Sequence, residues 1–185
     1  HQVGRLQGVH VPGIVLRPSS ALSAQFGVAY NNSINDSQWV RALAGPDRTH
    51  YIFGRLSQVT TSLTLRLNYT LSPTLSFQMY AQPFVSAGAY HGYKELVRPD
   101  ARRQAERYAP FAYAQNADFN VLSFRTTNVL RWEYRPGSTL FVVWQQGREG
   151  FTQRGDYRFG RDFGDLFATP ATNTVLVKLA YWLNP

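Results

Sequence analysis

Apolar and polar residues alternate one by one along several stretches of this chain. Between Ser62 and Leu71 every second residue is apolar, beginning with Leu63 and Leu65, and Ser, Thr, Arg or Asn fill the gaps. Successive side chains of a β-strand point to opposite faces, so this pattern predicts a strand with one apolar and one polar face. Five alternations in a row do not fit the 3.6-residue period of a helix.

The same alternation recurs from one end of the sequence to the other. Apolar residues alternate with polar ones after Leu22, Leu75, Leu122, Leu140 and Val175. The chain is therefore predicted to be all-β. We predict seven long strands, at residues 6–16, 21–31, 51–71, 75–86, 119–134, 139–147 and 173–183.

Short and long connections between these strands alternate. Pro18, Pro73 and Pro136 each mark a tight turn, because proline presets the turn dihedral and lacks an N–H for the ladder. Long polar stretches lie at 31–50, 87–118 and 147–173. Bacterial outer-membrane barrels have this asymmetry, with tight periplasmic turns and long external loops. The sequence therefore predicts an antiparallel up-and-down transmembrane β-barrel in the bacterial outer membrane.

In such a barrel one side of each strand faces lipid and the other faces the lumen. The residues predicted to face lipid or to form the aromatic girdle are Leu63, Leu65, Leu67, Tyr69, Phe77, Trp132, Tyr134, Trp144 and Tyr181. The charged residues predicted to face the lumen are Arg66, Arg125, Arg131, Glu133 and Lys178. The second set either biases a water-filled lumen toward anions or serves only to solvate and pair within the interior.

Composition narrows the classes of function. Aromatic residues make up 15% of the chain and charged residues 16%, and no apolar run is long enough for a membrane-spanning helix. The net charge of +8 attracts anions, but the arginines are scattered and no nucleic-acid-reading motif is present. We therefore expect membrane lipid and lipopolysaccharide as partners, and no nucleic acid.

Strand parity indicates that the predicted barrel continues beyond this chain. Bacterial single-chain barrels have an even number of strands, whereas seven are predicted here. We expect residues 1–185 to form a single domain, either the C-terminal portion of a larger barrel or an eight-stranded barrel with one strand missed.

The residue types that perform chemistry do not form a recognised catalytic or metal-binding pattern. His1, His10, His50 and His91 lack metal-ligand spacing, and no cysteine is present. An acidic group in the segment 155–164 either binds a cation or forms a loop that pairs with itself, and we favour the paired loop. We expect no enzyme, cofactor or metal. The rival is a hydrolase at the external rim, using the loop residues Asp47, His50, His91, Glu95 and Asp100. The acids and arginines expected to pair in and next to the segment 155–164 are Asp156, Asp162, Asp165, Arg158 and Arg161.

Four segments carry a resemblance to a known family. They are 130–146, which contains Arg-Trp-Glu-Tyr-Arg-Pro-Gly-Ser, together with 80–84, 118–120 and 177–183. These segments resemble the C-terminal outer-membrane β-barrel domain of bacterial proteins that carry a family 9-like carbohydrate-binding module. The resemblance implies an outer-membrane location, a longer parent chain and a carbohydrate-related role, and it supplies no catalytic residues.

The expected function is a passive conduit, receptor or surface scaffold with a basic interior. Such a protein would be porin-like and would lie in the outer membrane of a Gram-negative cell. Two alternatives stay open. The chain could be a subunit of a larger cell-envelope assembly that contacts other envelope proteins through its long loops. It could also be a soluble β-barrel that binds a small ligand, since such barrels have alternating strands too.

Overall fold

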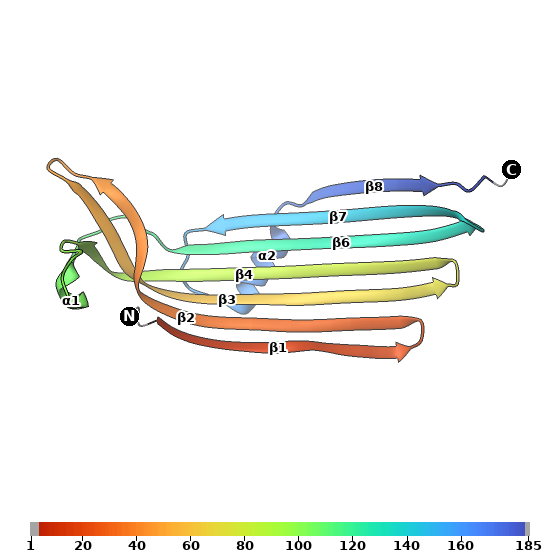
Figure 1. Ribbon diagram of the computed structural model, residues 1–185, viewed down its shortest axis with the longest axis horizontal. Coiled ribbons are helices and arrows are strands. Elements are labelled where there is room, and N and C mark those ends of the chain that lie inside the picture. The colour runs from red at the N-terminus through yellow and green to blue at the C-terminus, as the bar shows by residue number, and fades with distance from the viewer. Residues whose placement is uncertain (1–3, 184–185) are drawn as a thin grey trace.

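The computed structural model describes residues 4–183, and most of them belong to one antiparallel β-sheet (Figure 1). The long strands lie side by side in the order β1-β2-β3-β4-β6-β7-β8, and the short β5 pairs with β4. The strand bounds are β1 Gly4–Ser19, β2 Leu22–Ala44, β3 Thr49–Ser72, β4 Leu75–Leu96, β5 Tyr108–Pro110, β6 Phe119–Arg135, β7 Ser138–Thr152 and β8 Thr172–Ala180. Two helices accompany them, α1 at Gln104–Arg107 and α2 at Phe159–Ala168.

All seven predicted strands are present, and their antiparallel pairing is confirmed. The three tight turns lie at one end of the sheet (Figure 1). The turn between β6 and β7 contains Gly137, whose φ of 74° lies in the left-handed region that glycine adopts most easily. The turns and strands at this end therefore follow the sequence pattern closely.

The register joins the apolar side chains of neighbouring strands into one face, which we call the apolar face. Leu67 is paired with Met79, Phe77 with Leu130, and Leu130 with Val142. One residue further along, Arg66 is paired with Tyr80 and Tyr80 with Thr127, on the opposite or polar face. Directly paired residues share a face, so the alternation within each strand becomes a two-faced sheet.

At the opposite end the strands extend well beyond their predicted limits. The stretch 31–50 was predicted to be a long connection, but β2 and β3 continue through it as a paired hairpin. Trp39 packs edge-on against Phe53, with ring centroids 5.6 Å apart, and lies 6.3 Å from Tyr51. Aromatic pairs across strands thus stabilise a ladder whose polar residues had suggested a loop.

The extended hairpin bends away from the rest of the sheet (Figure 1). Its register shifts between Asn35 and Gln38 and again between Trp39 and Arg41. Such bulges increase the local twist and bend a strand. The stretch 87–118 was likewise predicted as a connection, but β4 runs through it to Leu96 before α1 and β5.

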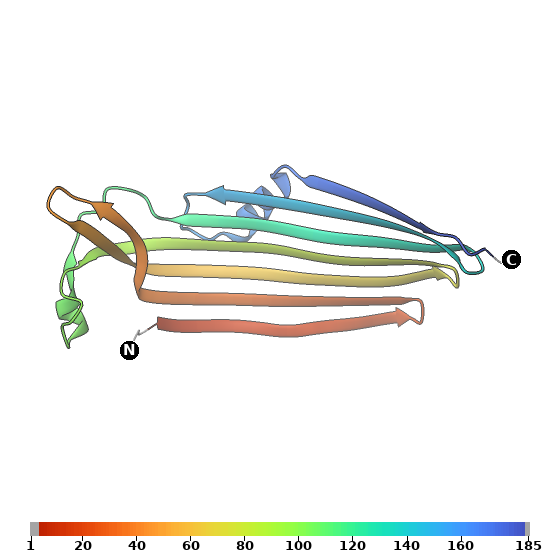
Figure 2. The ribbon, with the colours of Figure 1, turned by 45° about the horizontal axis from the view of Figure 1, so that its top comes forward.

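The stretch 147–173 differs most from the prediction of a polar connection. β7 continues to Thr152, and the chain then forms α2, which lies behind the sheet in Figure 1 and rises above β7 in the turned view of Figure 2. Phe163 and Leu166 of α2 are buried against Val85 of β4 and Leu122 of β6. The helix therefore covers part of the apolar face.

The sheet is open. β1 pairs only with β2, and β8 only with β7, among residues 4–183. Neither α1 nor α2, the two helices of that range, has the length and hydropathy required to span a membrane.

The packing of α2 can be tested by shortening one side chain. Leu166 is fully buried, so Leu166→Ala should lower the free energy of unfolding by about 2–5 kcal/mol through lost burial and a residual cavity. Phe159 on the same helix is half exposed, so Phe159→Ala is the matched control and should cost less. Urea unfolding followed by tryptophan fluorescence measures both. Equal costs would show that α2 is not held on the sheet by its inner face.

Candidate functional site

The charged residues predicted to face the lumen share the polar face of the sheet. Ser76 is paired with Arg131, Arg131 with Phe141, and Phe141 with Lys178. Arg125 is paired with Gln82 and Gly147, and Glu133 with Thr139, on the same face. The register therefore brings four cationic side chains and one acidic side chain to one side of the sheet.

Most of these charged side chains already interact with a neighbouring side chain of the sheet. Arg125 forms an ion pair with Glu149 at 3.0 Å, and Arg131 with Glu133 at 3.4 Å. The Arg66 guanidinium lies over the ring of Tyr80, 5.2 Å from its centroid. Lys178 forms no ion pair within residues 4–183. Within residues 4–183, Arg66 and Lys178 are thus the two cations of this set without a carboxylate partner.

Arg66 borders two depressions on the polar face. One has a volume of about 340 Å³ and includes Asn68, Gln78, Tyr80 and Thr127. The other has a volume of about 220 Å³ and includes Gln25 and Thr64. Polar side chains therefore surround this arginine on both sides.

The residues predicted to face lipid lie on the apolar face wherever the register pairs them, and their surroundings differ. Leu63 is partly buried against the cluster beneath α2. Trp132 and Tyr134 pack against each other near the tight turn, with ring centroids 6.0 Å apart. Trp132 and Trp144 are each more than two-fifths exposed. Tyr181 follows β8 and is also exposed.

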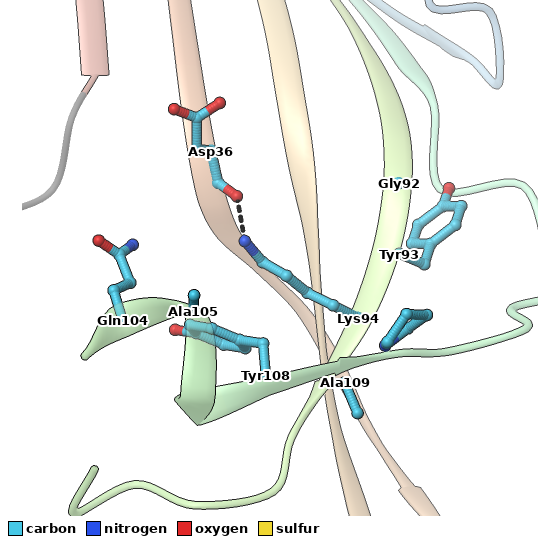
Figure 3. A pocket seen from close by; sticks show the side chains of 9 residues that line it. Asp36, Gly92, Tyr93, Lys94, Gln104, Ala105, Tyr108 and Ala109 are labelled. Carbon is cyan, nitrogen blue, oxygen red and sulfur yellow. Dashed lines mark hydrogen bonds between the residues drawn. The ribbon is translucent and has the colours of Figure 1, made fainter. Parts of the chain in front are cut away.

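A larger pocket lies at the bent end of the sheet, where β2, β4, α1 and β5 meet (Figure 3). Its volume is about 590 Å³, within the range of small-molecule sites. We call it the outer pocket. Its lining residues are Asp36, Gly92, Tyr93, Lys94, Gln104, Ala105, Tyr108, Ala109 and Pro110.

Local structure fixes each wall of the outer pocket. At the β2 bulge the Ser37 backbone N–H donates to the Asn35 side chain at 3.0 Å, which holds Asp36 at the rim. On the other side β5 pairs with β4, placing Pro110 opposite Lys94. Tyr108 packs edge-on against Phe53 of β3, with ring centroids 5.4 Å apart. Segments distant in the sequence thus form one preformed cavity.

Lys94 holds the two sides of the outer pocket together. Its ammonium donates to the Asp36 carbonyl oxygen at 2.6 Å and to the Ser37 hydroxyl at 2.8 Å, and it lies 4.5 Å from the centre of the Tyr108 ring. Partial burial of the charge lowers the pKa of Lys94, while the charge of Asp36 acts in the opposite direction. Burial likewise raises the pKa of the neighbouring Tyr93.

The residues considered for a rim hydrolase are only partly brought together. His50 Nδ1 lies 2.9 Å from the Glu95 carboxylate, and Arg48 binds the same carboxylate at 3.0 Å. Asp47 and Asp100 take part in no ion pair within the part of the chain described. The His50 ring also packs on Phe111, at 5.5 Å between ring centres. This arrangement joins the β2–β3 hairpin to β4.

The acids and arginines of the segment 155–164, with Asp165, pair with one another as predicted, and Arg154 joins them. Arg161 binds Asp156 and the fully buried Asp162, each at 2.8 Å, and Arg154 binds Asp165 at 2.5 Å. The hydrogen bond from Arg161 lowers the pKa of Asp156. Within residues 4–183 no group of three or more His, Cys, Asp or Glu side chains is arranged to hold a metal ion.

Sequence reasoning missed the outer pocket. Asp36 and Lys94 are 58 residues apart along the chain, and Gln104 lies in a stretch that shows no strand alternation. The signal that was present is the density of tyrosines from Tyr90 to Tyr113 in a segment taken to be a polar loop. Aromatic rings in a connection often mark a packed and ordered structure.

The fold places the chain among mostly β proteins built on one antiparallel, two-faced sheet. The chain belongs to the family described as a domain of unknown function, DUF5916, whose model matches residues 10–184. No curated protein and no solved structure matches the chain.

The lowered pKa of Lys94 can be measured because the chain has only one other lysine, Lys178. Reductive methylation with 13C-formaldehyde labels both amines, and Lys94→Arg identifies the Lys94 signal. That signal should titrate below pH 10.5 because burial disfavours the charge. Asp36→Asn should lower its midpoint further, since a charge that favours the ammonium is removed. A midpoint at or above 10.5 would contradict the burial of this amine.

Proposed function

We propose that this chain is a membrane-spanning portion of a bacterial outer-membrane β-barrel. Its apolar face lies against lipid, and its charged face lines the interior. The protein acts as a passive conduit, receptor or surface scaffold with a basic interior. The observation that carries the proposal is the apolar face, which runs across the register of seven long strands and is exposed outside the part that α2 covers.

The large accessible surface area of the chain supports the proposal that lipid covers part of it in the native protein. The accessible surface is 12329 Å², whereas a compact folded chain of 21.0 kDa exposes roughly 9,000 Å² by the usual size scaling. Large apolar side chains account for much of the excess, including Val175, Val177 and Leu179 at about three-fifths exposure. Water does not favour so large an apolar surface, and lipid does.

The height of the apolar face also supports a membrane. From the tight turns up to Leu63, which borders the cluster beneath α2, β3 contributes residues 63–71 and β4 residues 75–83. β8 has 9 residues in all. A transmembrane strand needs about 9–11 residues. In this arrangement α2 lies at the outer border of the lipid layer, and the bent ends of β2, β3 and β4 project beyond it.

The open edges of the sheet fit a barrel that further strands complete. The backbone groups along the outer edges of β1 and β8 have no partner strand within residues 4–183. Unpaired backbone groups are costly in lipid, so a sheet crosses a membrane only when it is closed. We propose that other strands of the same barrel pair with these edges.

The end of the sheet at the outer pocket carries exposed arginines, as expected for a surface next to lipopolysaccharide. Arg98, Arg102 and Arg103 are exposed next to the outer pocket, and the net charge of the chain is +8. Lipopolysaccharide carries phosphates, which arginine binds well. The carbohydrate-related role implied by the family resemblance is part of the same proposal. In the proposed orientation, this end of the sheet faces the glycans of the cell surface.

Single cysteines can test which face meets lipid, because the chain has none of its own. A fluorophore attached at Leu67→Cys should be quenched by brominated lipids when the full-length protein is reconstituted in vesicles. The same fluorophore at the adjacent Asn68→Cys is the matched control and should not be quenched, because successive residues point to opposite faces. Quenching at neither position would indicate a soluble protein, and the reversed pattern would overturn the assignment of faces.

The conduit form of the proposal predicts anion selectivity. Arg66→Ala combined with Arg125→Ala removes two positive charges from the polar face and should shift the reversal potential of the full-length protein toward cation permeation. Planar-bilayer recordings in a salt gradient measure this shift. Arg17→Ala, at the end of β1 next to a tight turn, is the control. A protein that forms no open pore would exclude the conduit form.

A further inference from the structure

The outer pocket has the features of a ligand site and not only of a packing defect. Its lining combines tyrosine rings with a carboxylate, a carboxamide and an ammonium group from different segments (Figure 3). Small-molecule sites have this composition, with apolar walls and a few polar groups that fix the orientation of the ligand. The pocket lies outside the proposed membrane layer, on the side that faces the medium.

The pocket is held open by contacts that do not fill it. Lys94 uses two of its three N–H groups on Asp36 and Ser37, across the gap between β4 and β2. Phe53 supports Tyr108 from β3, and Tyr113 contacts Tyr93 at 4.7 Å between ring centres. A cavity whose walls are fixed in advance loses less entropy when it binds a ligand.

Charge balance narrows the class of ligand. Lys94 binds the backbone carbonyl of Asp36, while the Asp36 carboxylate lies at the rim, where Arg55 approaches it at 3.4 Å. The charge of that carboxylate still acts on Lys94 and partly offsets its ammonium. No arginine lines the cavity, and only one carboxylate does. A strongly charged anion would meet Asp36, and a metal ion would lack ligands. The lining therefore favours an uncharged ligand.

The hydrogen-bonding groups select for hydroxyls. The Asp36 carboxylate accepts at the rim, Lys94 donates, and the exposed carboxamide of Gln104, whose amide lies 3.5 Å from the Ser37 hydroxyl, can do both. The tyrosine rings offer apolar surface with a polar tip, which suits a ring with C–H groups on its faces and hydroxyls at its edge. We propose that the outer pocket binds a sugar residue, so that the protein is a receptor for a neutral saccharide. The placement on the medium side rests on the proposed function, whereas the chemistry of the pocket does not.

Binding can be tested with defined sugars on the full-length protein in detergent. Glucose, galactose, maltose and cellobiose are the probes, and isothermal titration calorimetry and saturation-transfer NMR are the measurements. At least one sugar should bind, and Gln104→Ala should weaken its binding about tenfold, as expected for a lost hydrogen bond to a hydroxyl. Gln145→Ala is the matched control, since Gln145 is also exposed but lies on β7, outside the pocket. It should leave binding unchanged.

A second variant separates loss of binding from loss of structure. Asp36→Asn keeps the size of the side chain and the backbone carbonyl that Lys94 binds. It should weaken sugar binding without changing the near-ultraviolet circular dichroism of the tyrosines. Absence of binding for all four sugars, or equal binding by Gln104→Ala and wild type, would overturn the proposal. Inorganic phosphate that binds and is displaced by none of the sugars would identify an anion site and also overturn it.

The two proposals fail in different ways. Sugar binding by a protein whose Leu67→Cys label is not quenched by lipid would retain the pocket and overturn the membrane role. A quenched label without sugar binding would retain the membrane role and overturn the pocket.

Discussion

The fold depends on one geometric constraint, the strict alternation of side chains along a strand, combined with a register that never slips by one residue in the central part of the sheet. From Leu65 to Tyr69 on β3, every residue is paired with a residue of like face on β4. A slip of one position would place Arg66 among leucines and phenylalanines. The tight turns at Pro73 and Pro136 fix this register locally, which is why the two faces stay distinct over so many strands.

The same constraint explains what could be predicted from the sequence. The strands, their turns and the shared face of Arg66, Arg125 and Arg131 follow from period-2 alternation, which is a local property. The outer halves of β2 and β3 lose that alternation because both of their faces are polar or aromatic, so the pairing of Trp39 with Phe53 could not be read from either strand alone.

Neither helix α2 nor the outer pocket could be predicted from the sequence, and the reasons differ. Phe159, Phe163, Leu166 and Phe167 have helical spacing, but glycines and acids between them made the segment resemble a loop. Its surface for packing is supplied by Val85 and Leu122, far away in the sequence. The pocket arises from a bulge near Asp36 and from the reach of Lys94 past β3 to β2, and neither has a local signature.

The bent hairpin of β2 and β3 has a consequence for what can approach the molecule. Residues 31–44 add 14 positions to β2, or roughly 45 Å at the usual rise of a strand. In the proposed orientation its tip at Pro46 stands farthest from the cell, and the cavity near Asp36 is set back from that tip. In that orientation, a particle that approaches the cell along the strand direction meets the hairpin tip before it reaches the pocket.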